Sequence, residues 1–171
     1  MAIITLKGSQ FNTIGELPMV GTQAPDFTMT REDMTEVRLS DCHGKMTVLN
    51  IFPSLDTPTC AAAMKQFNKI AKQFPDAMIL CISADLPFAQ HRFCNIEHLQ
   101  NVIPVSIFRN PGFGKNYGVQ IMDGPLNGLL TRAVIVLDKE SRVVHTELVE
   151  ELANEPNYQA ALDCITSQNA V

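Results

Sequence analysis

The stretch Phe52-Pro-Ser-Leu-Asp-Thr-Pro-Thr-Cys60 joins two segments of different character and decides how the chain is expected to fold. Before it, Thr47-Val-Leu-Asn-Ile-Phe52 is rich in β-branched and aromatic residues and stops at Pro53, which cannot donate to a sheet ladder. After it, apolar side chains recur with the period of an amphipathic helix, at Met64, Phe67, Ile70, Ala71 and Phe74. The sequence therefore predicts a strand, a short loop and a helix with Cys60 at or near its N-terminus.

Short apolar runs alternate with helical patterns along the rest of the chain. Further strands are predicted at Ala77–Ser83, Ala133–Leu137 and Val143–Leu148, and a polar turn joins the last two. Alternation of this kind is typical of an α/β layer fold, so we expect a central mixed sheet flanked by helices.

Both ends of the chain carry patterns of their own. Ile3–Lys7 and Gln10–Ile14 flank the turn-forming pair Gly8-Ser9 and predict an N-terminal β-hairpin. A short helix is predicted after Pro87, and a closing amphipathic helix over Tyr158–Ile165.

Composition narrows the class of protein. With 171 residues and 46% hydrophobic side chains, the chain is able to bury one substantial core, so a single domain over residues 1–171 is expected. A net charge of −5 argues against nucleic acid or an anionic membrane as the main partner. Met1–Gly8 lacks the pattern of a secretory signal, and no apolar run approaches the ~18 residues of a membrane span. We therefore expect a soluble, cytoplasmic protein.

The five cysteines show no CxxC pair and no regular spacing, which favours chemistry over a structural disulfide framework. His91 lies three residues before Cys94, but a zinc site needs about four closely grouped ligands. The other histidines show no such grouping, namely His43, His98 and His145. No metal and no cofactor is therefore expected.

Cys60 stands where a thiol gains reactivity. A cysteine is nucleophilic only as its thiolate, and the first turn of a helix offers unpaired N–H groups and the positive end of the helix dipole. Thr57 can place its hydroxyl against the sulfur or against an approaching oxygen, while Pro53 and Pro58 stiffen the loop. The alternative is an ordinary buried thiol. The Pro-x-x-x-Thr-x-x-Cys context favours the reactive interpretation.

Placing a cysteine at a helix N-terminus by itself increases the rate of thiol attack only slightly. A thiol of pKa about 8.5 is roughly 3% thiolate at pH 7, and lowering its pKa to about 6 gains about 30-fold in thiolate. The same drop weakens intrinsic nucleophilicity about 13-fold, so a net factor of roughly two or three remains. A fast reaction therefore needs preorganised donors that align the substrate and stabilise developing charge.

Pro53, Thr57 and Cys60 match the peroxiredoxin active-site pattern Pro-x-x-x-(Thr/Ser)-x-x-Cys. Together with Asn50–Thr57, Leu80–Gln90 and Arg92–Cys94, they resemble the bacterial thiol peroxidase subfamily of the peroxiredoxins, of the atypical 2-Cys type, from the hairpin to the last helix. The resemblance implies a thioredoxin-like fold with an N-terminal hairpin, a homodimer, and reduction of hydroperoxides with electrons from thioredoxin.

The resemblance also implies roles for single residues. Cys60 matches the family's peroxidatic nucleophile, Cys94 its resolving thiol, which closes an intrachain disulfide, and Arg132 the arginine that contacts thiolate and peroxide. From spacing alone, Arg132 at a strand end would be solvated. Thr59 departs from the small or apolar residue expected there, which leaves the substrate preference open. Apolar side chains near the site and the behaviour of the subfamily favour organic or lipid hydroperoxides besides hydrogen peroxide.

The remaining cysteines and Asp56 receive no redox or catalytic role. Cys81 is interpreted as strand packing, Cys42 as a loop residue, Cys164 as part of the last helix, and Asp56 as a turn residue aimed away from the sulfur. Two other functions stay open at this point. A thiol oxidoreductase or isomerase would share the fold but uses Cys-x-x-Cys, and a redox sensor would use the same thiolate chemistry without efficient peroxide turnover.

Overall fold

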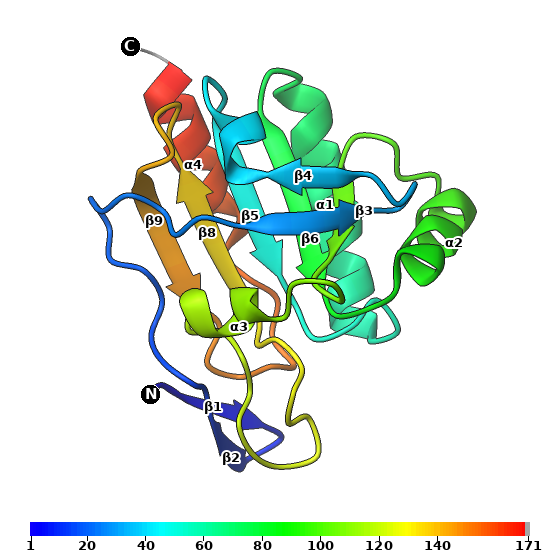
Figure 1. Cartoon of the computed structure of the whole chain (residues 1–171), viewed down its shortest axis with the longest axis vertical. Coiled ribbons are helices and arrows are strands. Elements are labelled where there is room, and N and C mark those ends of the chain that lie inside the picture. The colour runs from blue at the N-terminus through cyan, green and yellow to red at the C-terminus, as the bar shows by residue number, and fades with distance from the viewer. Residues whose placement is uncertain (170–171) are drawn as a thin grey trace.

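The computed structural model describes residues 1–169, which form a mixed sheet with helices on both faces and a separate hairpin (Figure 1). The sheet order is β4–β3–β7–β6–β5–β8–β9, with β3 (Thr28–Arg31), β4 (Glu36–Arg38), β5 (Thr47–Ile51), β6 (Met78–Ser83), β7 (Ile103–Ser106), β8 (Ala133–Leu137) and β9 (Val143–Leu148). β5, β6 and β7 run parallel, whereas β8 is antiparallel to β5 and β3 is antiparallel to β7. The predicted α/β fold with a central mixed sheet is confirmed.

Helices cover both faces of this sheet: η1 (Leu39–Cys42), α1 (Pro58–Gln73), α2 (Pro87–Glu97), α3 (Gly112–Asn116) and α4 (Tyr158–Asn169). Successive residues of a strand point to opposite faces, so Val134 packs toward α1 and α4 while Ile135 packs toward α3. Among residues 1–169 we find no helix with the length and apolar character of a membrane span.

The N-terminal hairpin is present with its turn one residue earlier than predicted. β1 (Ile3–Leu6) pairs with β2 (Ser9–Asn12), and Lys7 and Gly8 form the turn with φ of 50° and 88°. A two-residue hairpin turn with positive φ at both positions is favoured by strand twist. The predicted Gly8-Ser9 turn is therefore wrong by one position, because Gly8 takes the second place of the turn and Ser9 pairs in β2.

This hairpin docks on the segment that follows β9. The backbone N–H of Thr5 donates to the Glu150 carbonyl over 2.7 Å, and the N–H of Leu152 donates to the Thr5 carbonyl over 2.8 Å. The Thr5 hydroxyl also donates to the Glu151 carboxylate over 2.7 Å. The chain's first strand thereby holds residues 150–152, which reach the site described below.

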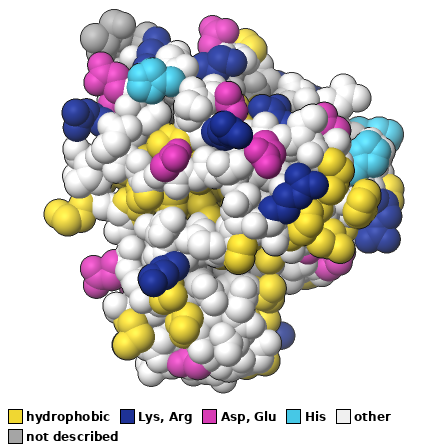
Figure 2. All heavy atoms as spheres, viewed as in Figure 1, with side chains coloured by type: hydrophobic (Ala, Val, Ile, Leu, Met, Phe, Trp, Pro, Cys, Tyr) yellow, Lys and Arg dark blue, Asp and Glu magenta, His cyan; other side chains and the backbone are white. Residues whose placement is uncertain are grey.

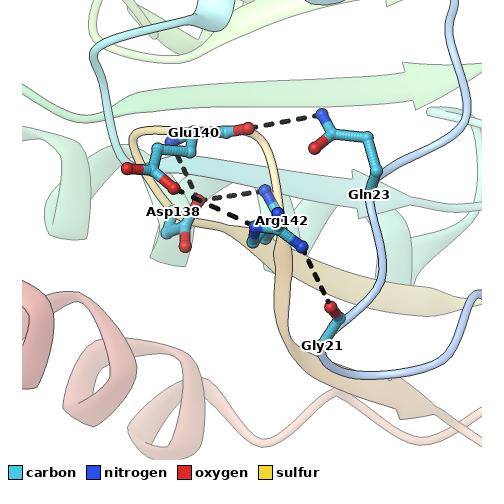
Figure 3. A network of polar contacts seen from close by, with 5 residues as sticks. All are labelled: Gly21, Gln23, Asp138, Glu140 and Arg142. Carbon is cyan, nitrogen blue, oxygen red and sulfur yellow. Dashed lines mark hydrogen bonds and ion pairs between the residues drawn. The ribbon is translucent and has the colours of Figure 1, made fainter.

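The polar turn between β8 and β9 is confirmed at the opposite end of β8 (Figure 3). The Asp138 carboxylate accepts from the backbone N–H groups of Glu140 and Arg142 over 2.8 and 2.9 Å. The Arg142 side chain reaches the Gly21 carbonyl over 3.5 Å, and Gln23 donates to the Glu140 carbonyl over 3.3 Å. These contacts fasten the segment before β3 to the turn.

Two further expectations need adjustment. The closing helix runs to Asn169 instead of ending at Ile165, because no helix-breaking residue follows Ile165. Cys42 was expected in a loop but ends η1 and is fully buried against the sheet, where its thiol packs as an apolar group.

We predict that Gly118→Ala lowers the free energy of unfolding by at least about 3 kcal/mol, because φ is +68° there and a Cβ would overlap the Glu16 backbone. Gly128→Ala is the matched control, since its φ is +94° but no atom lies near its Cβ position. It should cost only about 1 kcal/mol. Urea unfolding measures both, and equal losses would contradict the steric argument.

Candidate active site

Cys60 lies in the first turn of α1, as predicted. The helix begins at Pro58 with Thr57 as its N-cap residue, and Cys60 is fully buried. Thr57 makes no side-chain capping bond, and the first helical hydrogen bond runs from the Ala61 N–H to the Thr57 carbonyl. The Thr57 side chain therefore leaves the N–H groups at the start of α1 uncapped, and the helix dipole adds positive potential in the turn that holds Cys60.

Arg132 is buried against this sulfur. Its Nη2 donates to Cys60 Sγ over 3.2 Å and its Nε to the Leu152 carbonyl over 3.1 Å, and only 2% of the residue is exposed. The expectation from spacing alone, a solvated arginine, is wrong, because the start of β8 adjoins the end of β5 inside the sheet. Nη1 is buried and has no hydrogen-bond partner among the described protein atoms. One donor therefore stays available beside the thiol.

The loop between β5 and α1 places Thr57 as an acceptor. Its hydroxyl donates to the Ser54 carbonyl over 3.1 Å, so the oxygen lone pairs are left for an incoming O–H group. Pro53 is buried, whereas Asp56 is exposed and lies in a turn, as expected.

The carboxylate of Asp85, a residue that the sequence reasoning missed, holds this loop. It accepts from the Ser54 hydroxyl and from the Leu55 N–H, each over 2.8 Å. The available signal was the pair of short polar residues Ser83 and Asp85 at the end of a predicted strand, since neighbouring parallel strands end at the same edge of a sheet.

The segment after β9, which includes Ala153 and Tyr158, contacts α1 on another side of the site. The Thr59 hydroxyl donates to the Ala153 carbonyl over 3.1 Å, which gives this unexpected side chain a partner. The Tyr158 ring packs edge-on against Phe67 with ring centroids 5.3 Å apart, and its hydroxyl donates to Glu155 over 2.8 Å. Burial, followed by the contact with Glu155, raises the pKa of Tyr158, so it stays a neutral phenol. Sequence reasoning missed Tyr158 because it reads as a helix-start residue.

Cys94 lies inside α2, and only 6% of it is exposed. Burial, assisted by the negative charge of Glu32, raises the pKa of the Cys94 thiol to about 12. Cys60 and Cys94 belong to the same apolar cluster beneath the sheet, and all five cysteines are free thiols. The structure therefore brings both predicted cysteines to one core region but leaves Cys94 protonated and in regular helix.

The remaining thiols have no predicted role in this chemistry, although Cys81 belongs to the same apolar cluster as Cys60 and Cys94, and Cys164 packs against it. Cys81 is buried in β6, where desolvation raises its pKa to about 12, and Cys164 is half-buried in α4. The His91 ring contacts Asn95 over 3.0 Å and Glu32 over 3.6 Å. Among the 169 described residues, no three His, Cys, Asp or Glu side chains gather in a potential metal site.

The chain is similar in sequence to known proteins. The family model described as Redoxin matches residues 19–162. The thiol peroxidases of Mycobacterium tuberculosis and Mycobacterium bovis are each 52% identical over 162 residues, which is 95% of this chain and 97% of theirs. These relatives favour the peroxidase over the redox sensor or the Cys-x-x-Cys oxidoreductase.

Solved structures agree in architecture. A peroxiredoxin-like protein from Aquifex aeolicus superposes with a TM-score of 0.92 at 36% identity, covering 98% of both chains. A thiol peroxidase from Chromobacterium violaceum superposes with a TM-score of 0.90 and covers 98% of this chain and 97% of its own, but at 19% identity it shows the fold alone. The expected thioredoxin-like peroxiredoxin fold is confirmed.

We predict that Cys94 in the reduced, folded protein reacts with iodoacetamide at pH 7 at least about 100-fold more slowly than in the urea-unfolded chain. Because folding raises the pKa of Cys94, its contribution to stability is fully present below about pH 8.5 and is lost as the pH rises toward about 12. Alkylation of the folded protein should therefore keep accelerating above about pH 8.5, where alkylation of the unfolded chain levels off. Peptide mass mapping follows the reaction, and similar folded and unfolded rates at pH 7 would refute the prediction.

Proposed function

This chain belongs to the Redoxin family and is a thiol-dependent peroxidase that reduces hydroperoxides, and we propose that Cys60 is the thiolate that attacks the substrate. The observation that carries this proposal is the 3.2 Å contact between Arg132 Nη2 and the sulfur of Cys60, a buried residue in the first turn of α1. A cation and aligned N–H groups favour the anionic sulfur where bulk water is excluded.

The first step transfers one oxygen atom to sulfur. The Cys60 thiolate attacks the terminal oxygen of ROOH, the S–O bond forms as the O–O bond breaks, and the leaving RO⁻ takes a proton to give ROH. Cys60 becomes a sulfenic acid. The Thr57 oxygen accepts the hydrogen bond of the peroxide O–H, and Arg132 stabilises the sulfur anion and the charge on the departing oxygen. Pro53 shields the site and fixes the loop.

The second step forms the disulfide. The Cys94 sulfur attacks the Cys60 sulfenic sulfur, the S–S bond replaces the S–O bond, and water leaves with the thiol proton. Since the pKa of Cys94 in the folded helix is about 12, a thiolate at neutral pH requires local opening of α2. Opening also supplies the approach to within the roughly 7 Å between Cα atoms that a disulfide needs. Thioredoxin then reduces the disulfide by thiol–disulfide exchange.

The wider setting of the enzyme is part of the same proposal. The chain acts as one cytoplasmic domain over residues 1–171 and as a homodimer. Exposed apolar side chains follow the carboxyl ends of β6 and β7, namely Leu86, Phe88 and Phe108, and hydrophobic atoms gather on the α2 side in Figure 2. Such a patch is typical of an interface between protein chains. Organic or lipid hydroperoxides are proposed as substrates besides hydrogen peroxide.

We predict that Arg132→Ala lowers kcat/KM for hydroperoxide by at least about tenfold, or ~1.4 kcal/mol of transition-state stabilisation. Arg142→Ala is the matched control, because Arg142 lies beyond the other end of β8 in the exposed network of Figure 3. Its kcat/KM should equal that of the wild type. Steady-state peroxide consumption with a thiol reductant measures both variants, and an unchanged rate in a folded Arg132→Ala protein would remove Arg132 from the mechanism.

Intact-mass analysis tests the resolving role of Cys94. After one equivalent of peroxide, the wild type should lose about two mass units and gain no oxygen, whereas Cys94→Ser should retain one oxygen or become over-oxidised. Cys164→Ser, which removes a half-buried helix thiol, should behave as the wild type. Peptide maps that join Cys60 to Cys42, Cys81 or Cys164, or that join two subunits, would contradict the assignment.

A further inference from the structure

Asp85 is hydrogen-bonded to the loop before Cys60 and, through two other residues, to the helix that carries Cys94. It lies between the end of β6 and the start of α2. On the loop side, its carboxylate accepts from the Ser54 hydroxyl and the Leu55 N–H over 2.8 Å each. The carbonyl of Ser54 in turn accepts the Thr57 hydroxyl over 3.1 Å. One carboxylate therefore fixes the loop that presents Thr57 to the substrate.

On the helix side, the same carboxylate reaches α2 through two buried residues. The Ser83 hydroxyl donates to Asp85 over 2.7 Å, and Gln90 Nε2 donates to the Ser83 oxygen over 3.3 Å and to the Val105 carbonyl over 2.8 Å. Ser83 and Gln90 have no exposed surface. Gln90 precedes Cys94 by four residues, so both lie on one side of α2. A continuous hydrogen-bonded chain thus joins the Cys60 loop to the Cys94 helix.

We propose that Asp85 is a positioning residue that holds the Cys60 loop and the Cys94 helix closed together and couples their opening. This inference rests on the proposed roles of Cys60 and Cys94. None of the ion pairs among residues 1–169 involves Asp85, so the carboxylate of this half-buried residue is compensated by these hydrogen bonds and by solvent, without a cation. Bonds to an ionised acceptor are about twice as strong as neutral ones, and releasing either side weakens the support of the other.

The coupling has opposite consequences for the two chemical steps. Attack on peroxide needs the closed loop, because Thr57 and Arg132 align the substrate only there. Disulfide formation needs the open state, because the Cys94 thiol is buried and protonated when α2 is intact. A sulfenic acid that waits in the closed site can meet a second peroxide and become a sulfinic acid. Asp85 therefore sets the balance between resolution and over-oxidation.

The test separates these steps in Asp85→Asn, which keeps the side-chain shape but removes the charge and turns one acceptor into a donor. Quenched-flow mass spectrometry follows sulfenic acid, disulfide and sulfinic acid. We expect sulfenic acid formation to slow at least fivefold, disulfide formation to accelerate at least fivefold, and the sulfinic fraction at excess peroxide to fall. Asp56→Asn, the same change on an exposed carboxylate of the same loop, should leave all three as in the wild type.

A second variant approaches the network from α2. Gln90→Met removes the donor to Ser83, together with the bond to the Val105 carbonyl, without touching the loop, and it should also accelerate disulfide formation. If Asp85 and Gln90 act through one network, disulfide formation in the double variant should be accelerated by less than the product of the two single accelerations. Slowing of both steps in Asp85→Asn, or no change in either, would overturn the coupling. A wild type that forms no Cys60–Cys94 disulfide would instead overturn the proposed resolving role of Cys94, on which this inference rests.

Discussion

Burying the Arg132 guanidinium beside the Cys60 sulfur removes a full positive charge from water. Acceptor atoms from other parts of the fold compensate for this loss of hydration. The Leu152 carbonyl accepts a hydrogen bond from Nε, and the Cys60 sulfur accepts one from Nη2. Nη1 has no partner among the described protein atoms and is the proposed donor to an oxygen of the substrate. A buried cation is tolerated when its donors are satisfied by well-placed acceptors, and it then acts strongly because little solvent screens it. The antiparallel pairing of β8 with β5 creates this contact, since it sets the start of one strand beside the end of the other.

The two thiols of the proposed mechanism occupy opposite environments. Cys60 stands at a helix start beside a cation, whereas Cys94 is held in the apolar interior, where its raised pKa keeps it protonated. The separation is useful chemically because a permanently ionised second thiol near the site would disfavour the first thiolate by charge repulsion. In the proposed mechanism, disulfide formation therefore depends on a local opening of α2, which the hydrogen bonds around Asp85 would oppose.

Local features of this protein were predictable from its sequence, and long-range ones were not. Residues 47–60 combine β propensity, a proline stop and helical periodicity within a short window, so the strand, loop and helix around Cys60 follow from neighbours in the chain. Arg132 lies 72 residues from its sulfur partner, and nothing local distinguishes it from a solvated strand-end arginine. The resemblance to a known family supplied that contact. Asp85 and Tyr158 read as turn and helix-start residues, because their importance arises only when distant segments pack. The hairpin turn differed by one position, since either pair at Lys7–Ser9 contains the required glycine.

The docking of β1 on residues 150–152 has a consequence for biosynthesis. Thr5 leaves the ribosome early, but the backbone and side-chain acceptors that it binds lie 145 and 146 residues further along the chain. At about 5 to 20 residues per second, the hairpin waits roughly 7 to 29 s for these partners. During this interval Ile4 and Phe11, which are buried in the finished protein, lack Leu152 as a packing partner. Pairings of such high sequence separation form late in folding. The carbonyl that accepts from Arg132 comes from the same late segment, so the nascent chain completes the surroundings of Cys60 only after residue 152 has been synthesised.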